Sequence, residues 1–275
     1  MRYHMEIQLW REILAPYQLA VDELVVKFNH IKQQYQNAKM YSPIENVSGR
    51  VKRVSSILEK TQRKHVSLEE LEEKIEDIAG IRLICQFVED INAVVEIIRN
   101  RKDLEIKQEK DYITQSKPSG YRSYHIIAYY TVHTINGPKR LEVEIQIRTM
   151  AMNFWSTIEH SLQYKYKEHM PDELRMRLLR VADAVDALDN EMASVRDEIM
   201  DAQNSNRQKA TIISDILNNI DNLYYVANER EVTKIQNEFF KIYQKDDMEM
   251  LMRFNKQLDI IAETYRAQSV AGNIL

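Results

Sequence analysis

The sequence contains little of the chemistry on which extracellular and membrane proteins depend. Its 275 residues include a single cysteine, Cys85, so neither a disulfide framework nor a cysteine metal site can form within the chain. No window approaches the roughly 18 to 20 continuous apolar residues of a membrane-spanning helix, and the N-terminus lacks the apolar stretch of a signal peptide. We therefore expect a soluble protein of the reducing cytoplasm.

Glycine is also scarce, with five residues where ordinary usage of about 7% would give roughly 19. Three of them, Gly49, Gly80 and Gly120, lie in the polar segments described below, which indicates unusual torsions or close backbone approach there. The chain lacks a Walker loop, a dinucleotide-binding glycine fingerprint and a His-Glu-x-x-His motif. It has no His-Asp dipeptide either, which argues against a metal-dependent phosphohydrolase built on that pair.

Charge is unevenly distributed along the chain. The net charge of -4 argues against bulk binding of nucleic acid, yet residues 49–65 are strongly basic. A local cationic surface on an acidic protein suits a small anionic ligand better than a long polyanion. The basic side chains of this segment are Arg50, Lys52, Arg53, Lys60, Arg63 and Lys64, against the single acidic Glu59.

Hydrophobic spacing predicts helices on either side of a sheet. Apolar residues at steps of three and four from Trp10 to Ile31 predict one long amphipathic helix, which ends before Ser42-Pro43. The order of helices, mixed sheet and helices predicts an α+β (mixed α/β) domain. The other expected elements are a basic helix from Ser55 or Ser56 to His65, a strand over 81–88, a helix over 91–99, and β-rich runs over 121–133 and 140–148 around the hairpin signal Asn136-Gly137.

The second β-rich run alternates cleanly between apolar and polar residues. Because strand side chains point to opposite faces in turn, all of its polar chemistry lies on one face of the sheet. The apolar face carries Leu141, Val143, Ile145 and Ile147, and the polar face carries Glu142, Glu144, Gln146 and Arg148.

Helical spacing resumes from about Asn153 and dominates the rest of the chain. After Pro171, apolar residues step four and three from Leu174 to Ile199, which predicts either a coiled-coil seam or a long helix packed on its own domain. The polar stretch Gln203 to Ala210 indicates a hinge. We expect a main domain over residues 1–204 and a helical extension over 205–275 in which no chemical motif is visible.

Two acidic residues, Asp77 and Glu144, lie beside or within predicted strands of the sheet. Phosphoryl-type transfer requires Mg²⁺ to neutralise charge, and Mg²⁺ prefers one or two carboxylates together with phosphate oxygens and water. The pair meets that requirement. The alternative is a solvated acidic strand face with Asp77 as a helix cap.

The basic segment places cations around the start of a helix. Unpaired N–H groups, the helix dipole and side-chain charge together favour a bound phosphate at such a place. The alternative is an exposed basic helix face. Arg82, after the Ala79-Gly80 turn, is suited either to stacking on a purine or to pairing with an acid. The residues concerned are Arg50 and Lys52 before the helix and Ser56, Lys60 and Arg63 along it.

A third segment, Gly120 to His125, places Tyr121 directly after a glycine, with Lys117 close before it. Stacking of a base on tyrosine, with phosphate contacts from lysine and histidine, is chemically coherent. The alternatives are core or edge packing for Tyr121 and a structural role for His125.

Taken together, these segments resemble the RelA/SpoT-type alarmone synthetases, and in particular the small alarmone synthetases of the RelQ branch. The resemblance spans roughly residues 10 to 203. It lies in Ser42-Pro43-Ile44-Glu45, Gly49-Arg50-Val51-Lys52, Ser56-Ile57-Leu58-Glu59-Lys60, Asp77 to Arg82, Gly120 to His125, Val143 to Thr149, Ala151-Met152-Asn153-Phe154-Trp155 and Ile158-Glu159-His160-Ser161.

The resemblance implies a five-stranded mixed sheet flanked by helices, of the nucleotidyltransferase-like synthetase type, that moves pyrophosphate from ATP to the 3′-hydroxyl of GTP or GDP. It implies that Asp77 and Glu144 bind Mg²⁺ and that Glu144 draws the proton from the hydroxyl. The implied ATP residues are Arg50 and Arg82 around adenine and Lys52, Ser56, Lys60 and Arg63 on the phosphates. The implied GTP or GDP residues are Tyr121 on guanine, Asn153 reading the base, Lys117 and His125 on phosphates or ribose, and Gln146.

The resemblance also implies a homo-oligomer, a tetramer, assembled through the helix over 174–199, with alarmone or single-stranded RNA as candidate regulators. One departure concerns regulation, because Asn46 stands where close relatives carry an aromatic residue after Ser-Pro-Ile-Glu. Two other functions stay open on the residues alone, namely pyrophosphate transfer to a tRNA 3′ end and a nucleotide- or RNA-sensing module without turnover.

Overall fold

The computed structural model describes residues 2–67, 70–165, 170–225 and 227–272. Its contacts divide the chain into two compact units, Met1–Ala193 and Ser194–Leu275, each with its own hydrophobic core. The division falls inside helix α6 (Asp172–Leu223). The domain boundary expected at residue 204 stays a prediction.

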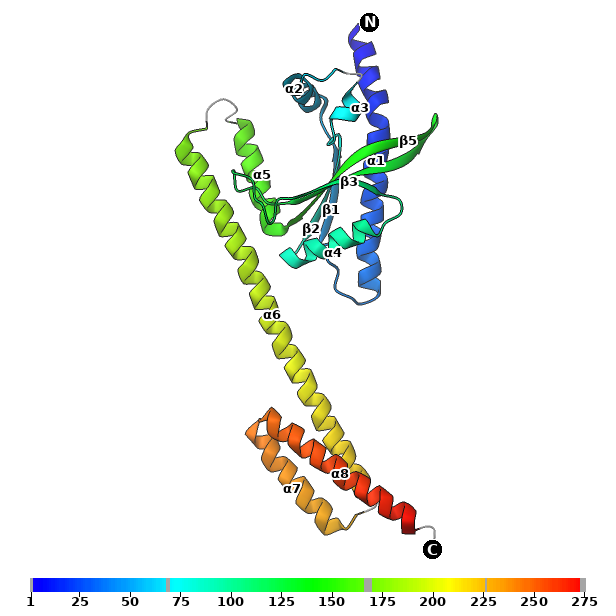
Figure 1. The fold of residues 1–275 in the computed structure, drawn as a ribbon, viewed down its shortest axis with the longest axis vertical. Coiled ribbons are helices and arrows are strands. Elements are labelled where there is room, and N and C mark those ends of the chain that lie inside the picture. Colours follow the sequence, from blue (N-terminus) through cyan, green and yellow to red (C-terminus); the bar gives the residue numbers. More distant parts are fainter. Residues whose placement is uncertain (1, 68–69, 166–169, 226, 273–275) are drawn as a thin grey trace. The chain divides into compact units, whose positions relative to one another are not determined.

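Within the described residues, five strands of the N-terminal unit form one mixed sheet in the order β1-β2-β5-β4-β3 (Figure 1). β2 and β5 are parallel, and the other neighbours are antiparallel. The predicted mixed five-stranded sheet with flanking helices is confirmed. The strands are β1 (Asn46–Val51), β2 (Ala79–Cys85), β3 (Glu105–Asp111), β4 (Tyr124–Thr134) and β5 (Gly137–Thr149).

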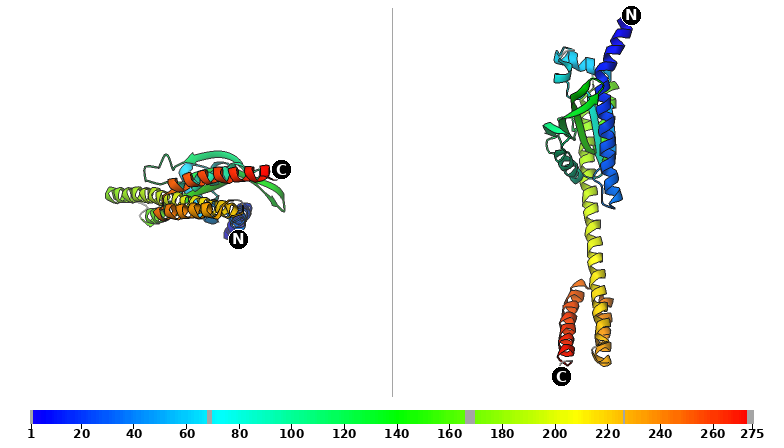
Figure 2. Two further views of the ribbon diagram at one scale, coloured as in Figure 1. Left: turned by 90° about the horizontal axis from the view of Figure 1, so that it is seen from below. Right: turned by 90° about the vertical axis from the view of Figure 1, so that its right-hand side faces the viewer.

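Helix α1 (Arg2–Asn37) packs along one face of the sheet, as Figure 2 shows, and contacts β1, β2, β4 and β5. Its buried apolar residues, among them Leu24 and Phe28, belong to the main core. The helix lies so close to β1 that a Cβ atom added to Gly49 would stand 2.6 Å from Cγ1 of Val21. The glycine therefore permits a direct helix-on-strand contact.

The remaining helices of this unit match the predicted order, except for one short helix over residues 71–74 that was not predicted. The strand expected over 81–88 is β2, which begins and ends slightly earlier, and Gly137 of the expected turn has a φ of 101°. Two strands, β1 and β3, were not predicted. The helices are α2 (Val54–Lys64), α3 (Leu71–Lys74), α4 (Val88–Arg99) and α5 (Met150–Lys165).

The C-terminal unit contains the end of α6 together with α7 (Glu229–Lys245) and α8 (Met248–Gly272). The hinge predicted over Gln203–Ala210 is wrong, because α6 is helical throughout that stretch. All three helices contribute to the apolar core of this unit, so the extension has a core of its own. That core includes Ile216, Ile220, Leu223, Val232, Phe239, Leu251, Phe254 and Leu258.

Most of the predicted heptad stripe of α6 faces solvent. Leu188 is 52% exposed and Met192 is 48% exposed, whereas Ala182 and Asp189 on another face of the helix are buried. Packing of the stripe on its own domain is therefore wrong for the exposed positions. These are Leu174, Val181, Leu188, Met192, Val195 and Ile199.

Candidate active site

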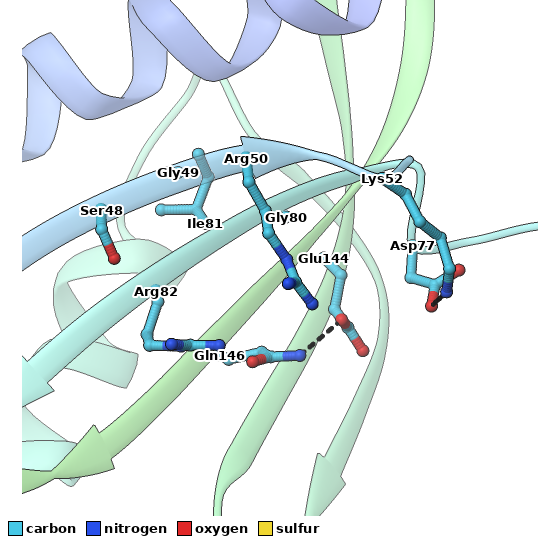
Figure 3. A pocket seen from close by; sticks show the side chains of 10 residues that line it. All are labelled: Ser48, Gly49, Arg50, Lys52, Asp77, Gly80, Ile81, Arg82, Glu144 and Gln146. Carbon is cyan, nitrogen blue, oxygen red and sulfur yellow. Dashed lines mark hydrogen bonds and ion pairs between the residues drawn. The ribbon is translucent and has the colours of Figure 1, made fainter. Parts of the chain in front are cut away.

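The strand register aligns the predicted site residues in two rows on the face of the sheet opposite α1. Gly80 lies between the two outer residues of the first row, and its missing side chain opens the floor of a pocket there. Asp77 and Lys52 line the same pocket (Figure 3). The first row is Arg50, Gly80 and Glu144 on β1, β2 and β5, and the second is Arg82, Gln146 and His125 on β2, β5 and β4.

Asp77, just before β2, is held between two lysines. Its carboxylate accepts hydrogen bonds from Nζ of Lys52 at 2.5 Å and from Nζ of Lys60 at 2.8 Å. Burial raises the pKa of the Asp77 carboxyl, but the two lysines outweigh it and the net pKa lies below the ordinary value. Asp77 is therefore an anion at neutral pH.

Glu144 on β5 is held by two polar neighbours, His125 and Gln146. Nδ1 of His125 lies 3.0 Å from Oε1 of Glu144, and Nε2 of Gln146 donates to Oε2 at 2.7 Å. Burial raises the pKa of Glu144, whereas His125 and Gln146 lower it further than burial raises it. The side chain is only 16% exposed, so Glu144 is an oriented and largely buried carboxylate.

The predicted phosphate-binding residues gather at one larger hollow beside this pocket. The end of β1 and one side of α2, from its first turn to its last, line this hollow, and His160 and Ser161 of α5 line it as well. His160 and Ser161 belong to a segment of the family resemblance to which sequence reasoning assigned no role. The predicted residues brought together here are Arg50, Lys52, Ser56, Lys60 and Arg63.

Tyr121 and His125 form a second, aromatic half of the site. The Tyr121 hydroxyl lies 2.8 Å from Nε2 of His125, and Tyr112 packs edge-on to His125 with ring centroids 5.2 Å apart. Nζ of Lys117 stands 4.8 Å from the centre of the Tyr121 ring, and burial lowers the pKa of this lysine. Three predicted acceptor residues are thus brought together, with Tyr112 as an unpredicted neighbour.

Arg148 is a further residue of the site to which sequence reasoning assigned no role. It is 4% exposed and donates from Nη2 to the Tyr121 hydroxyl at 2.6 Å and to Oε1 of Gln146 at 2.7 Å. A buried guanidinium with fixed acceptors positions its partners. The alternation of the strand had already placed Arg148 on the polar face, and that was the available signal.

Two predicted residues carry buried polar atoms without a hydrogen-bond partner in the described part of the protein. These atoms are Nε of Arg82 and Oδ1 of Asn153. Burial, together with the charges of Arg148 and Arg50, lowers the pKa of Arg82. Such atoms ordinarily find a partner, so both suit contact with a ligand. Asn153 lies in the first turn of α5, outside the lining of the two pockets.

The donor set at the pocket suits a hard divalent cation shared with a substrate. Among the described residues, no group of three or more His, Cys, Asp or Glu side chains is placed to hold a metal ion. Asp77 and Glu144 nevertheless line one pocket. Hard divalent cations in phosphate-transfer sites take one or two carboxylates and complete their coordination with phosphates and water. The two carboxylates therefore fit such an ion.

Comparison with known proteins identifies the family. Residues 49–169 match the region found in RelA and SpoT proteins. The chain is 49% identical over 199 residues to the GTP pyrophosphokinase YjbM of Bacillus subtilis, covering 72% of this chain and 94% of that protein. The chain belongs to the RelA/SpoT family, in its small alarmone synthetase branch.

Solved structures of this branch resemble the structure of this chain. Small alarmone synthetase 1 of Bacillus subtilis bound to its product pppGpp superposes with a TM-score of 0.68 at 49% identity, over 70% of this chain and 98% of that one. The same synthetase bound to AMPCPP gives a TM-score of 0.62 at 45% identity, over the same shares. In the described part of this family member, no helix is long and apolar enough to cross a membrane.

Proposed function

We propose that this protein transfers the β,γ-pyrophosphate of ATP to the 3′-hydroxyl of GTP or GDP, giving pppGpp or ppGpp and AMP. One observation supports this most strongly. Glu144 lines the pocket of Arg50, Arg82 and Asp77 and is also hydrogen-bonded to His125 of the aromatic half. A carboxylate at the junction of a phosphate-binding hollow and an aromatic subsite suits transfer between two nucleotides.

The larger hollow, which we call the basic hollow, together with the adjoining pocket that Arg82 lines, is the proposed donor subsite. Arg50 and Arg82 project from neighbouring strands and have planar guanidinium groups that stack on a purine. Four side chains, one just before α2 and three along it, hold the triphosphate, and the helix N-terminus adds to the charge at the start of the helix. These are Lys52, Ser56, Lys60 and Arg63.

The aromatic half is the proposed acceptor subsite. The ring of Tyr121 stacks on guanine, Asn153 offers its unpartnered Oδ1 to the base, and Gln146 contacts the acceptor. Lys117 and His125 lie beside the tyrosine and meet the ribose or the phosphates. Relatives of this chain include a synthetase crystallised with pppGpp, which supports a guanosine nucleotide here.

Glu144 is the proposed proton acceptor for the 3′-hydroxyl. Its lowered pKa keeps it ionised at neutral pH and at the same time makes it a weak base, so the proton moves late in the reaction. Catalysis then depends chiefly on alignment. Holding two nucleotides in line replaces a bimolecular encounter, an advantage of up to about 7 to 11 kcal/mol in well-oriented cases.

Mg²⁺ is the proposed cofactor, held by Asp77 and Glu144 together with the nucleotide phosphates. Bound there, the ion would neutralise charge on the migrating pyrophosphate. Lys52 and Lys60 orient the Asp77 carboxylate and keep it ionised. The same lysines line the basic hollow, so they lie next to both the proposed metal site and the proposed site for the ATP phosphates.

The deciding experiment incubates the protein with ATP labelled at the γ-phosphate, Mg²⁺ and either GDP or GTP. We expect the label to move onto the guanosine nucleotide with an equal yield of AMP, separated by anion exchange, and we expect EDTA to stop the transfer. Absence of transfer under conditions where both nucleotides bind would contradict the proposal.

We also propose a homotetramer in the cytoplasm. The six exposed apolar positions of the α6 stripe follow the spacing of a helix seam, which favours pairing with the same helix of another copy. The lone buried thiol of Cys85 suits a reducing compartment. A monomeric mass in light scattering at micromolar concentration would contradict the assembly.

A further inference from the structure

The N-terminal part of α6 has a second, buried face, distinct from the exposed stripe. Ala182, Asp186, Asp189 and Ala193 follow one another at steps of four and three and therefore share one side of the helix. Of these, Ala182 is 2% exposed and Asp189 is 5% exposed, whereas the side chain of Asp186 is 39% exposed. All four lie in the N-terminal unit, where this side of the helix contacts two segments of the proposed site.

The first contact is with the loop that carries two of the proposed acceptor residues. Backbone hydrogen bonds from Lys117 to Tyr121 and from Gly120 to Lys117 close this loop on itself. Gly120 has a φ of 86°, and a Cβ atom there would lie 2.5 Å from Cβ of Ala182. Next to the tyrosine, Nε of Arg122 lies 3.1 Å from Oδ1 of Asp186.

The second contact is at the junction of β5 and α5. The buried hydroxyl of Thr149 donates to Oδ2 of Asp189 at 2.6 Å and accepts from the backbone N–H of Met152 at 3.1 Å. Thr149 follows Arg148, which holds Tyr121 and Gln146, and Met152 precedes Asn153. A single hydroxyl thus ties α6 to the strand and the helix that carry the rest of the acceptor subsite.

We propose that α6 is a positioning element of the acceptor subsite and that Asp186 and Asp189 are its polar anchors. Asp186 fixes the loop of Lys117 and Tyr121, and Asp189 fixes the start of α5 relative to β5. The proposed donor residues come from β1, α2, β2 and the segments next to them. α5 reaches the donor hollow only near its far end, at His160 and Ser161, so the anchors act chiefly on the guanosine nucleotide. This inference rests on the proposed function.

The test measures KM for GDP and for ATP separately, each at saturating concentration of the other. Asp186→Arg and Arg122→Asp each place like charges together, and we expect each to raise KM for GDP about fivefold. The double exchange restores the pair and returns KM for GDP to near the wild-type value. Asp189→Ala raises it about tenfold, whereas Asp189→Asn, which keeps an oxygen acceptor for Thr149, raises it less. KM for ATP should change much less in each variant.

Asp183→Ala is the matched control, because Asp183 is an exposed aspartate on the same helix, and it should move neither constant. Equal effects on both nucleotides, or no rescue by the double exchange, would reduce these contacts to general packing and overturn the inference. If the wild-type protein transfers no pyrophosphate, the proposed function has failed. Calorimetric titration of the same variants with GDP then still measures the acceptor subsite.

Discussion

Glu144 is the residue at which the two halves of the site meet. Its two carboxylate oxygens already have partners, His125 on one and Gln146 on the other. Both partners orient the group, and the histidine also favours its charged form. The residue is therefore held in the ionised state before substrate arrives.

Loss of that charge should remove catalysis and leave the fold intact. We expect Glu144→Gln to lower kcat for pyrophosphate transfer by about 10² to 10⁴-fold, since a positioned proton acceptor contributes that much. Glu142→Gln is the matched control on the same strand and face, where the carboxylate binds Lys107 at 2.6 Å, and it should retain turnover. Synthesis by Glu144→Gln at the wild-type rate would remove this residue from the mechanism.

Asp77 predicts a pH dependence of stability. Its pKa in the folded protein lies below the unfolded value near 3.8, so its pairing stabilises the fold above that pH and the contribution is lost as the pH falls through the folded pKa. We expect Asp77→Asn to lower the free energy of unfolding by a constant amount above about pH 5 and by progressively less in more acid solution. Urea titration followed by tryptophan fluorescence measures this difference in free energy of unfolding between the wild type and the variant. A difference that grows as the pH falls would contradict the prediction.

At the scale of elements, α1 and β1 are in close contact at Gly49. Adding one methyl group there drives it into Val21 and Val25, at 2.6 Å and 2.8 Å. We expect Gly49→Ala to lower the free energy of unfolding by about 1 to 3 kcal/mol, as overpacking does.

Gly80→Ala provides the comparison for that variant. Its nearest neighbour would be the carbonyl oxygen of Arg50 at 3.7 Å, an ordinary contact, so the change in stability should stay under about 1 kcal/mol. The added methyl group would instead narrow the pocket between Arg50 and Glu144. Equal loss of stability in the two variants would show that the packing of α1 on β1 is not the cause.

The two strands that the sequence did not predict have one physical feature in common. β1 and β3 are the two edge strands of the sheet. An edge strand is partly solvated, so β3, with the sequence Glu-Ile-Lys-Gln-Glu-Lys-Asp, shows no apolar alternation. The central strand β5 alternates, and the amphipathic α1 has its period, so both were predictable. The predicted hinge failed because polar residues also occur where a helix is exposed on many sides.

The site was predictable to a different degree in its two halves. The residues of the basic hollow share a short stretch of sequence, so their proximity follows from one strand and one helix. Arg148 was harder, because a polar residue on a strand carries no sign that it will be buried among Tyr121, Gln146 and Ser123. Long-range contacts of this kind arise from register and are not visible in local spacing.

For the whole molecule, the two separate cores predict two separable unfolding events. Both tryptophans, Trp10 and Trp155, lie in the N-terminal unit, so their fluorescence reports on that unit, whereas circular dichroism reports on both. Phe239, 4% exposed in the C-terminal core, should cost roughly 3 to 5 kcal/mol when replaced by alanine. We expect Phe239→Ala to lower only the circular dichroism transition of its own unit.

Phe28→Ala is the matched variant in the N-terminal core, where the ring is fully buried. It should shift the fluorescence transition and leave the unfolding of the C-terminal unit in place. If either variant moved both transitions equally, the units would unfold as one cooperative body.

The position of β1 at the edge of the sheet has a consequence for the order in which the site becomes rigid. This strand pairs with β2 alone, while β4 and β5 each have partners on both sides. Backbone amides of an edge strand open to solvent more readily than those of interior strands, so amide hydrogen exchange should be faster around Arg50 and Lys52 than along β5. Binding of a nucleoside triphosphate would slow that exchange, so the donor half of the site becomes rigid only when its own substrate binds.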